Sequence, residues 1–134
     1  MIKNLSNELS CGMKIISNKI EESQFEAKIQ IDLSNKVNKE ESRLMQLFDV
    51  IEEKDDNGKV VRLYLVMPLA SFGNVKELRN KLKEEKDELV KNLVIKIVFQ
   101  NLLIGLWQMH QHDYYHMDVK CENMVVSKSS ERLI

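Results

Sequence analysis

The stretch Tyr-Tyr-His-Met-Asp-Val-Lys-Cys-Glu-Asn-Met-Val-Val, residues 114–126, places an acid, an amine and an amide at short intervals before a β-branched pair. Asp118 and Lys120 are two residues apart, and Asn123 follows Asp118 by five. An acid that orients a hydroxyl, an ammonium that neutralises a phosphoryl group and an amide oxygen that ligates magnesium suit phosphoryl transfer. The same residue types also populate solvated turns, so the triplet alone leaves both interpretations open.

The composition is that of one globular domain. The chain has 134 residues, of which 43% are hydrophobic and 31% charged, and single domains commonly have about 100–150 residues. Lys and Arg number 20 against 21 Asp and Glu, so no overall field favours nucleic acid or an anionic membrane. We therefore expect no binding to nucleic acid and none to a membrane.

The cysteines and the N-terminal residues indicate a reducing compartment. Cys11 and Cys121 cannot form a disulfide framework and lack the paired spacing of a zinc site. The first residues contain no apolar segment of signal-peptide length, and we expect no run to approach the roughly 18 apolar residues of a membrane span. The sequence thus predicts a soluble, intracellular protein, most simply a cytoplasmic one.

The first half of the chain has the pattern of a strand, a helix and a hairpin. A short β-prone segment predicts a strand at 11–16. Apolar residues spaced by four or five predict a helix over about 19–38. Two apolar-rich segments, 44–51 and 60–67, flank an Asn-Gly turn signal within 52–59, which predicts a hairpin.

The second half has the pattern of a connector and two helices. A proline, which lacks an amide donor, and a glycine make 68–74 a connector. Helical spacing predicts a polar surface helix from 75 to about 88, and a helix over 89–109 that is apolar on most faces and so belongs in a domain core. Short strands are expected at 124–126 and from 132. The fold class predicted is α+β.

Around the opening stretch the sequence resembles the eukaryotic protein-kinase family. The family pattern His-Arg-Asp-x-Lys-x-x-Asn appears as His116-Met117-Asp118-Val119-Lys120-Cys121-Glu122-Asn123. The segment 102–110 is similar to the family's central helix, whose last His precedes the motif His by six residues, as His110 precedes His116. Both histidines are expected to pack and hydrogen-bond rather than to bind metal.

The resemblance extends to the nucleotide-binding segments of the family. Residues 63–70 are similar to the strand and hinge that receive adenine, with Met67 as gatekeeper and the backbone of Pro68 and Ala70 at the purine edge. Asn74 falls where many kinases place a ribose-contacting residue.

The strand at 11–16 resembles the Val-Ala-Ile-Lys strand of the family. The resemblance makes Lys14 the partner of the α- and β-phosphates, and it places Gly12 and Val125 on either side of the adenine. A single lysine on a strand is ordinarily a solvated charge, and only its register with the other segments favours this role.

The resemblance implies a truncated two-lobe kinase-like fold spanning residues 1–134. Residues 1–67 would be part of the small lobe, 68–74 the hinge and 75–134 the start of the large lobe. The implied function is ATP-dependent phosphorylation of serine or threonine in proteins, with ATP and Mg²⁺.

The implied roles in the loop are specific. Asp118 would orient the substrate hydroxyl and accept its proton, Lys120 would steady the γ-phosphate, and Asn123 would bind magnesium. A lysine two residues after the aspartate is the serine/threonine form of the loop.

Several departures from the family pattern favour an alternative, a catalytically inactive kinase-like fragment or module that binds a partner. No Gly-rich loop precedes Lys14, and the chain stops about where Asp-Phe-Gly would begin. The best alignment puts Lys28 in place of the glutamate that pairs with this lysine, while Glu26 or Glu22 would serve in a shifted register. A separate departure concerns control: Met117 replaces the arginine that in many family members receives an activation-loop phosphate, so this mode of control would not apply.

Two further expectations follow. If the chain is the middle of a kinase domain, the helix over 89–109 stays partly uncovered, which predicts exposed apolar area and a tendency to associate. A helical adaptor unrelated to kinases, by contrast, would have neither a hinge nor a strand after Asn123.

Overall fold

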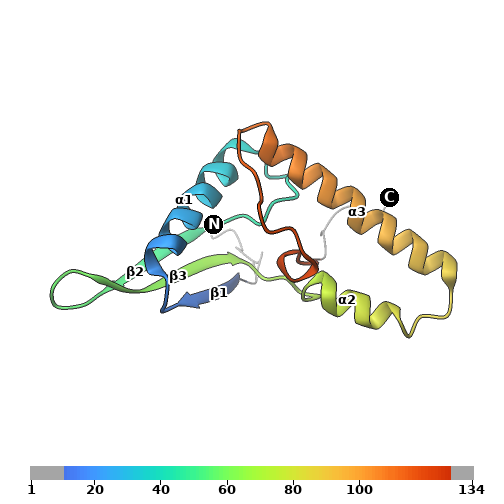
Figure 1. The fold of residues 1–134 in the computed structure, drawn as a ribbon, viewed down its shortest axis with the longest axis horizontal. Helices are drawn as coiled ribbons and strands as arrows, with labels where there is room; N and C mark the ends of the chain where they lie inside the picture. The colour runs from blue at the N-terminus through green and yellow to red at the C-terminus, as the bar shows by residue number, and fades with distance from the viewer. Residues whose placement is uncertain (1–10, 128–134) are drawn as a thin grey trace, which may run out of the picture. The chain divides into compact units, whose positions relative to one another are not determined.

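The chain folds into a small sheet and a set of helices in the residues that the computed structural model describes, 11–127. In chain order these elements are β1 Cys11–Ile16, α1 Ile20–Lys36, β2 Asp49–Lys54, β3 Val60–Pro68, α2 Val75–Leu82, α3 Glu88–His110 and the 3₁₀ turn η1 Cys121–Asn123 (Figure 1). The expected α+β class is confirmed. The described residues form two compact units, 11–35 with 45–69, and 36–44 with 70–127.

The first unit contains an antiparallel sheet with β3 in the middle, in the order β1-β3-β2 (Figure 1). Its core joins α1 to the inner face of the sheet through buried apolar side chains: Ile16, Ala27, Leu47, Leu63 and Leu65. Leu63 on the central strand is fully buried. The predicted strand at 11–16 is confirmed, and the predicted helix is found with its ends two residues or fewer inside the expected bounds.

The β2–β3 hairpin turns where the Asn-Gly signal predicted. The Asp55 carboxylate accepts the backbone N–H groups of Asn57 at 3.0 Å and Lys59 at 2.9 Å, and Gly58 adopts a φ of 78°, which an L-residue rarely adopts. The first strand of the hairpin was predicted at 44–51, but it runs from Asp49 to Lys54.

Local contacts explain this shift of the strand. Residues before 49 are engaged by α1, because Gln30 donates to the Met45 carbonyl at 2.9 Å and Ser34 Oγ accepts the Leu47 N–H at 3.1 Å. The acidic residues that looked like turn positions instead extend the strand, since Glu53 forms an ion pair with Arg62 of β3 at 3.3 Å.

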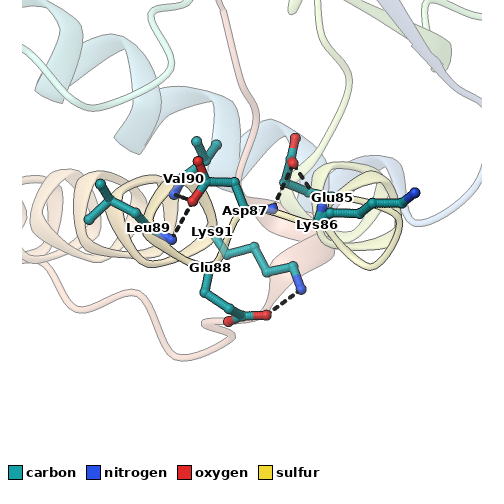
Figure 2. A network of polar contacts seen from close by, with 7 residues as sticks. All are labelled: Glu85, Lys86, Asp87, Glu88, Leu89, Val90 and Lys91. Carbon is teal, nitrogen blue, oxygen red and sulfur yellow. Dashed lines mark hydrogen bonds and ion pairs between the residues drawn. The ribbon is translucent and has the colours of Figure 1, made fainter.

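In the second unit the polar linker between α2 and α3 is shaped by two acidic side chains (Figure 2). The Glu85 carboxylate accepts the N–H groups of Lys86 at 2.8 Å and Asp87 at 2.9 Å. Asp87 is the N-cap of α3 and accepts the N–H of Leu89 at 2.8 Å. These bonds favour a turn, and α2 therefore ends at Leu82 rather than near residue 88 as predicted.

Helix α3 has the predicted bounds to within one residue, but its predicted burial is wrong for residues 11–127. Its buried residues are Gly105 and Gln108. Leu89 is 77% exposed, Phe99 58% and Trp107 60%. Within residues 11–127 few groups pack on the helix: the segment 36–44 contacts it along one side, where the Arg43 backbone lies close to Gly105 and Arg43 also hydrogen-bonds with Asn101 and Gln108. The expectation of exposed apolar area is confirmed.

The expectation that no segment approaches the length of a membrane span is wrong for α3. Residues Glu88–His110 make a helix that is long and apolar enough to cross a bilayer, with a mean hydropathy of 1.6 over an 18-residue window. Core helices of globular domains meet the same criterion, so this finding concerns length and composition alone.

The predicted strand at 124–126 is reduced to a single antiparallel bridge between Asn74 and Val125. The strand expected from residue 132 lies outside the described residues.

Candidate functional site

In the loop after α3, two polar side chains contact the carboxylate of a third residue, Asp118. Lys120 Nζ lies 2.8 Å from Asp118 Oδ2, and the Asn123 amide nitrogen donates to the same oxygen at 2.9 Å. The Asn123 amide also donates to the Asp118 carbonyl at 3.0 Å. Asp118 is thus in direct contact with both Lys120 and Asn123, the two residues whose spacing predicted a shared site.

The loop is shaped by the end of α3 and by its own backbone. The N–H of Tyr114 donates to the Met109 carbonyl at 3.1 Å, which turns the chain back after the helix, and Asp113 takes a φ of 61° at the bend. The rings of His110 and Tyr115 pack with centroids 5.2 Å apart. His116 accepts the Asp118 N–H through its carbonyl and, at 3.4 Å, through Nδ1.

These contacts agree with the packing and hydrogen-bonding roles predicted for the two histidines. Among residues 11–127 no three His, Cys, Asp or Glu side chains are grouped to hold a metal ion.

The far end of the loop is tied to the segment before α2. Val75 N–H donates to the Met124 carbonyl at 2.8 Å, Val126 N–H donates to the Gly73 carbonyl at 2.8 Å, and Phe72 N–H donates to the Val126 carbonyl at 3.0 Å. Two residues predicted to contact nucleotide, Asn74 and Val125, are therefore neighbours. The Asn74 side-chain oxygen is used as the N-cap of α2, where it accepts the Glu77 N–H at 3.0 Å.

The charges of the loop stabilise each other. The hydrogen bond from Lys120 lowers the pKa of Asp118, and further lowering comes from the Asn123 hydrogen bond and the nearby charges of Lys120 and His116. The hydrogen bond to Asp118 and its negative charge raise the pKa of Lys120. Asp118 is therefore a carboxylate and Lys120 an ammonium at neutral pH.

In the first unit, three of the residues predicted to contact adenine lie side by side. Gly12 is paired with Met67 across β1 and β3, and Cys11 with Pro68. A Cβ built on Gly12 would lie 3.6 Å from the Leu69 side chain, an ordinary van der Waals contact, so the space there would also accept a small side chain.

The other predicted site residues divide between the two units. Lys14 pairs with Leu65 in the sheet of the first unit. The second unit holds the remaining site residues: Ala70, Asn74, Asp118, Lys120, Asn123 and Val125.

A shallow depression of about 360 Å³ in the first unit brings Lys14 together with glutamates of α1. Its lining includes Glu22 and Glu26 but not Lys28, which the alignment had placed opposite Lys14. Glu22 forms an ion pair with Lys19 at 3.4 Å. Glu22 and Glu26 are four residues apart and therefore lie on one face of the helix. This spacing could have identified them as the residues near Lys14 in place of Lys28.

The side-chain amide of Asn123 fits a magnesium ligand. Its nitrogen makes both hydrogen bonds to Asp118, which leaves its oxygen, a hard ligand, available for a cation. Mg²⁺ commonly takes one or two protein oxygens and fills its other positions with water and phosphate oxygens.

No family model matches the chain. The sequence is 25% identical over 111 residues to Misshapen-like kinase 1 of Rattus norvegicus, covering 83% of this chain and 8% of that protein. It is 30% identical over 94 residues to serine/threonine-protein kinase ksp1 of Schizosaccharomyces pombe, covering 67% and 18%. It is 31% identical over 74 residues to serine/threonine-protein kinase mig-15 of Caenorhabditis elegans, covering 55% and 6%. The chain is thus similar, over parts of its length, to small portions of proteins named as kinases.

Proposed function

We propose that the chain is part of a protein kinase of the serine/threonine type, which transfers the γ-phosphoryl group of ATP to a hydroxyl of a protein substrate. The observation that carries this proposal is the contact of Lys120 and Asn123 with the Asp118 carboxylate. The partial similarity to proteins named as serine/threonine kinases supports it.

The proposed reaction uses the loop residues as follows. The substrate hydroxyl oxygen attacks the γ-phosphorus, the bond from phosphorus to the β–γ bridging oxygen breaks, and the hydroxyl proton ends on the Asp118 carboxylate. Lys120 turns from Asp118 to neutralise the transferring group. Asn123 would hold Mg²⁺, which supplies charge neutralisation at the phosphate oxygens.

The nucleotide contacts of the proposal rest on the resemblance to the kinase family. Gly12, Met67 and Pro68, which lie side by side in the sheet, would contact the adenine. Lys14 would contact the α- and β-phosphates. Three residues of the second unit complete the nucleotide contacts that the resemblance implies: Ala70 and Val125 for the adenine, and Asn74 for the ribose. The two-lobe arrangement and the hinge at 68–74 belong to this proposal, as does a cytoplasmic location.

One observation favours the alternative, an inactive kinase-like module that binds a partner. Within the described range 11–127, Lys14 is exposed and makes no ion pair. In an active kinase the corresponding lysine is held by a glutamate. A chain that binds nucleotide or a partner without transferring phosphate would keep the loop but not this ion pair.

The test separates binding from transfer. Purified chain is assayed for transfer of the γ-phosphoryl group from MgATP to a generic acceptor protein, and its thermal midpoint is measured with and without MgATP. We expect Asp118→Asn to lower transfer at least 100-fold, since general-base catalysis contributes about 10²–10⁴-fold.

Asp113→Asn is the matched control, because it removes the same charge from the same loop at a residue outside the contact. Equal transfer by Asp118→Asn and Asp113→Asn would refute the catalytic role. A thermal shift without transfer would favour the inactive module, and the lack of any shift at millimolar MgATP would exclude nucleotide binding by this chain.

A further inference from the structure

The second unit has a depression of about 180 Å³ that no residue of the loop 114–126 lines. Its lining comes from the segment 36–44, from the end of α3 and from the turn that follows this helix. The Gln108 amide on the lining donates to the Glu41 carbonyl at 3.0 Å, and Gln108 is buried. The two walls of the depression are therefore joined by a hydrogen bond that is shielded from water.

Two side chains on the lining are open to a ligand, Trp107 and Glu41. Trp107 is largely exposed, although its ring is the largest aromatic surface that a protein side chain offers. Within residues 11–127 the Glu41 carboxylate forms neither an ion pair nor a hydrogen bond. Its backbone carbonyl, by contrast, accepts from Gln108 and from Arg43. The depression thus presents an aromatic ring together with a negative charge that the described residues do not neutralise.

The other charged and polar groups of the lining leave this arrangement intact. Lys36 also belongs to the lining, and its ammonium group lies over the Tyr114 ring, with Nζ 5.9 Å from the ring centroid. This cation therefore has an aromatic partner of its own. Gln111 adds a side-chain amide, whose oxygen accepts hydrogen bonds.

The size and chemistry of the depression fit the end of an arginine side chain. A guanidinium group stacks on aromatic rings and donates two parallel hydrogen bonds to a carboxylate. A phosphate or carboxylate ligand would instead meet the negative charge of Glu41. The volume is below the roughly 300–1,000 Å³ of pockets for drug-sized ligands, so it suits one side chain rather than a whole cofactor.

We propose that this depression binds an arginine side chain of a partner protein, with the guanidinium stacked on Trp107 and paired with the Glu41 carboxylate. Gln111 accepts a further N–H of the same group. The site takes no part in the proposed phosphoryl transfer, and its test needs no catalysis.

The first test uses the fluorescence of Trp107, which is the only tryptophan of the chain. The whole chain is titrated with N-acetyl-arginine amide at constant ionic strength, and with N-acetyl-citrulline amide, which has nearly the same shape but no charge. We expect a saturable change with the arginine probe and none with citrulline. We also expect N-acetyl-lysine amide to bind more weakly, because an ammonium lacks the planar fork. An equal response to citrulline or to lysine would overturn the proposal.

The second test repeats the arginine titration with variants. We expect Glu41→Gln to weaken binding about tenfold, because charge-assisted hydrogen bonds are roughly twice as strong as neutral ones. This substitution keeps the backbone carbonyl that binds Gln108. Glu40→Gln is the matched control, since Glu40 is an exposed neighbour that does not line the depression, and it should bind as the unaltered chain does.

Two outcomes of the second test would contradict the arginine site. Equal weakening by Glu41→Gln and Glu40→Gln would assign the binding to general charge attraction. A saturable response of Trp107 to inorganic phosphate that is stronger than the response to the arginine probe would make the depression a site for anions.

Discussion

The side-chain oxygen of Gln108 accepts the backbone N–H of Arg43 at 2.9 Å, although 65 residues separate the two in the chain. The Gln108 amide nitrogen also donates to the Glu41 carbonyl at 3.0 Å. Gln108 is 7% exposed, so both bonds are shielded from water. One glutamine of α3 thereby fastens the segment 36–44 within the second unit.

Replacing this glutamine should destabilise the chain. Gln108→Leu leaves the Arg43 N–H and the Glu41 carbonyl without their partner, and we expect a loss of about 2 kcal/mol in the free energy of unfolding, since each unsatisfied buried group costs about 1–3 kcal/mol. Urea unfolding measures the loss. Gln100→Leu is the control, because Gln100 is an exposed residue of the same helix. Similar losses in both variants would contradict the role of the two hydrogen bonds.

The pairing of Asp118 and Lys120 predicts a dependence of stability on pH. The folded pKa of Asp118 lies below its ordinary value of 3.8, so the pair contributes stability above the unfolded pKa, and this contribution is lost as the pH falls through the folded pKa. We expect Lys120→Met to be less stable than the unaltered chain near pH 7 and equal to it at the lowest pH. Thermal midpoints measured across the acid range would show the two curves converging, and a constant difference at every pH would rule the linkage out.

A substitution at Gly73 should disturb the start of α2. Gly73 has a φ of 73°, and a Cβ there would overlap the Glu77 carboxylate. The carboxylate is the far end of a flexible side chain that can turn away, so we expect Gly73→Ala to cost about 1–2 kcal/mol, as the left-handed conformation alone does. Gly58→Ala is the matched control, because Gly58 has a φ of 78° with open space around it. Equal losses in the unfolding free energy would confirm this expectation, and a clearly larger loss at Gly73 would contradict it.

The exposed apolar side chains of α3 predict association. Leu93 is 56% and Ile97 49% exposed, one turn apart on the helix. We expect Leu93→Glu with Ile97→Glu to lower the binding of a hydrophobic dye and the association seen in sedimentation velocity. The control, Asn92→Glu with Gln100→Glu, adds the same charge at exposed polar positions of the helix. An equal reduction by the control would assign the effect to charge rather than to apolar surface.

The local signals of the sequence predicted local structure well. The Asn-Gly turn, the strand at 11–16 and the bounds of α3 depend on residues close in the chain, and all three are found. The contact of Asp118 with Lys120 and Asn123 is likewise a matter of short spacing. Such features are predictable because the residues that determine them lie close together in the sequence and show a local pattern.

Features that depend on distant partners were missed. An all-round apolar helix predicted burial, yet burial requires other elements to cover it, and residues 11–127 leave most of α3 exposed. Gln108 looked like an ordinary polar residue in an apolar helix until its partners at 41 and 43 were known. The ion pair between Lys76 and Glu122 joins residues 46 positions apart, and no pattern in either segment indicated it.

The bridge between Asn74 and Val125 has a consequence for the order of folding. It closes a loop of about 50 residues, and the entropic cost of closing such a loop is larger than the cost of closing one helical turn. Helices form within about a microsecond, whereas such non-local contacts come later. The loop that carries Asp118 is therefore expected to take its final shape after α2 and α3 have formed, and to be among the first parts of the unit to open when the chain is heated.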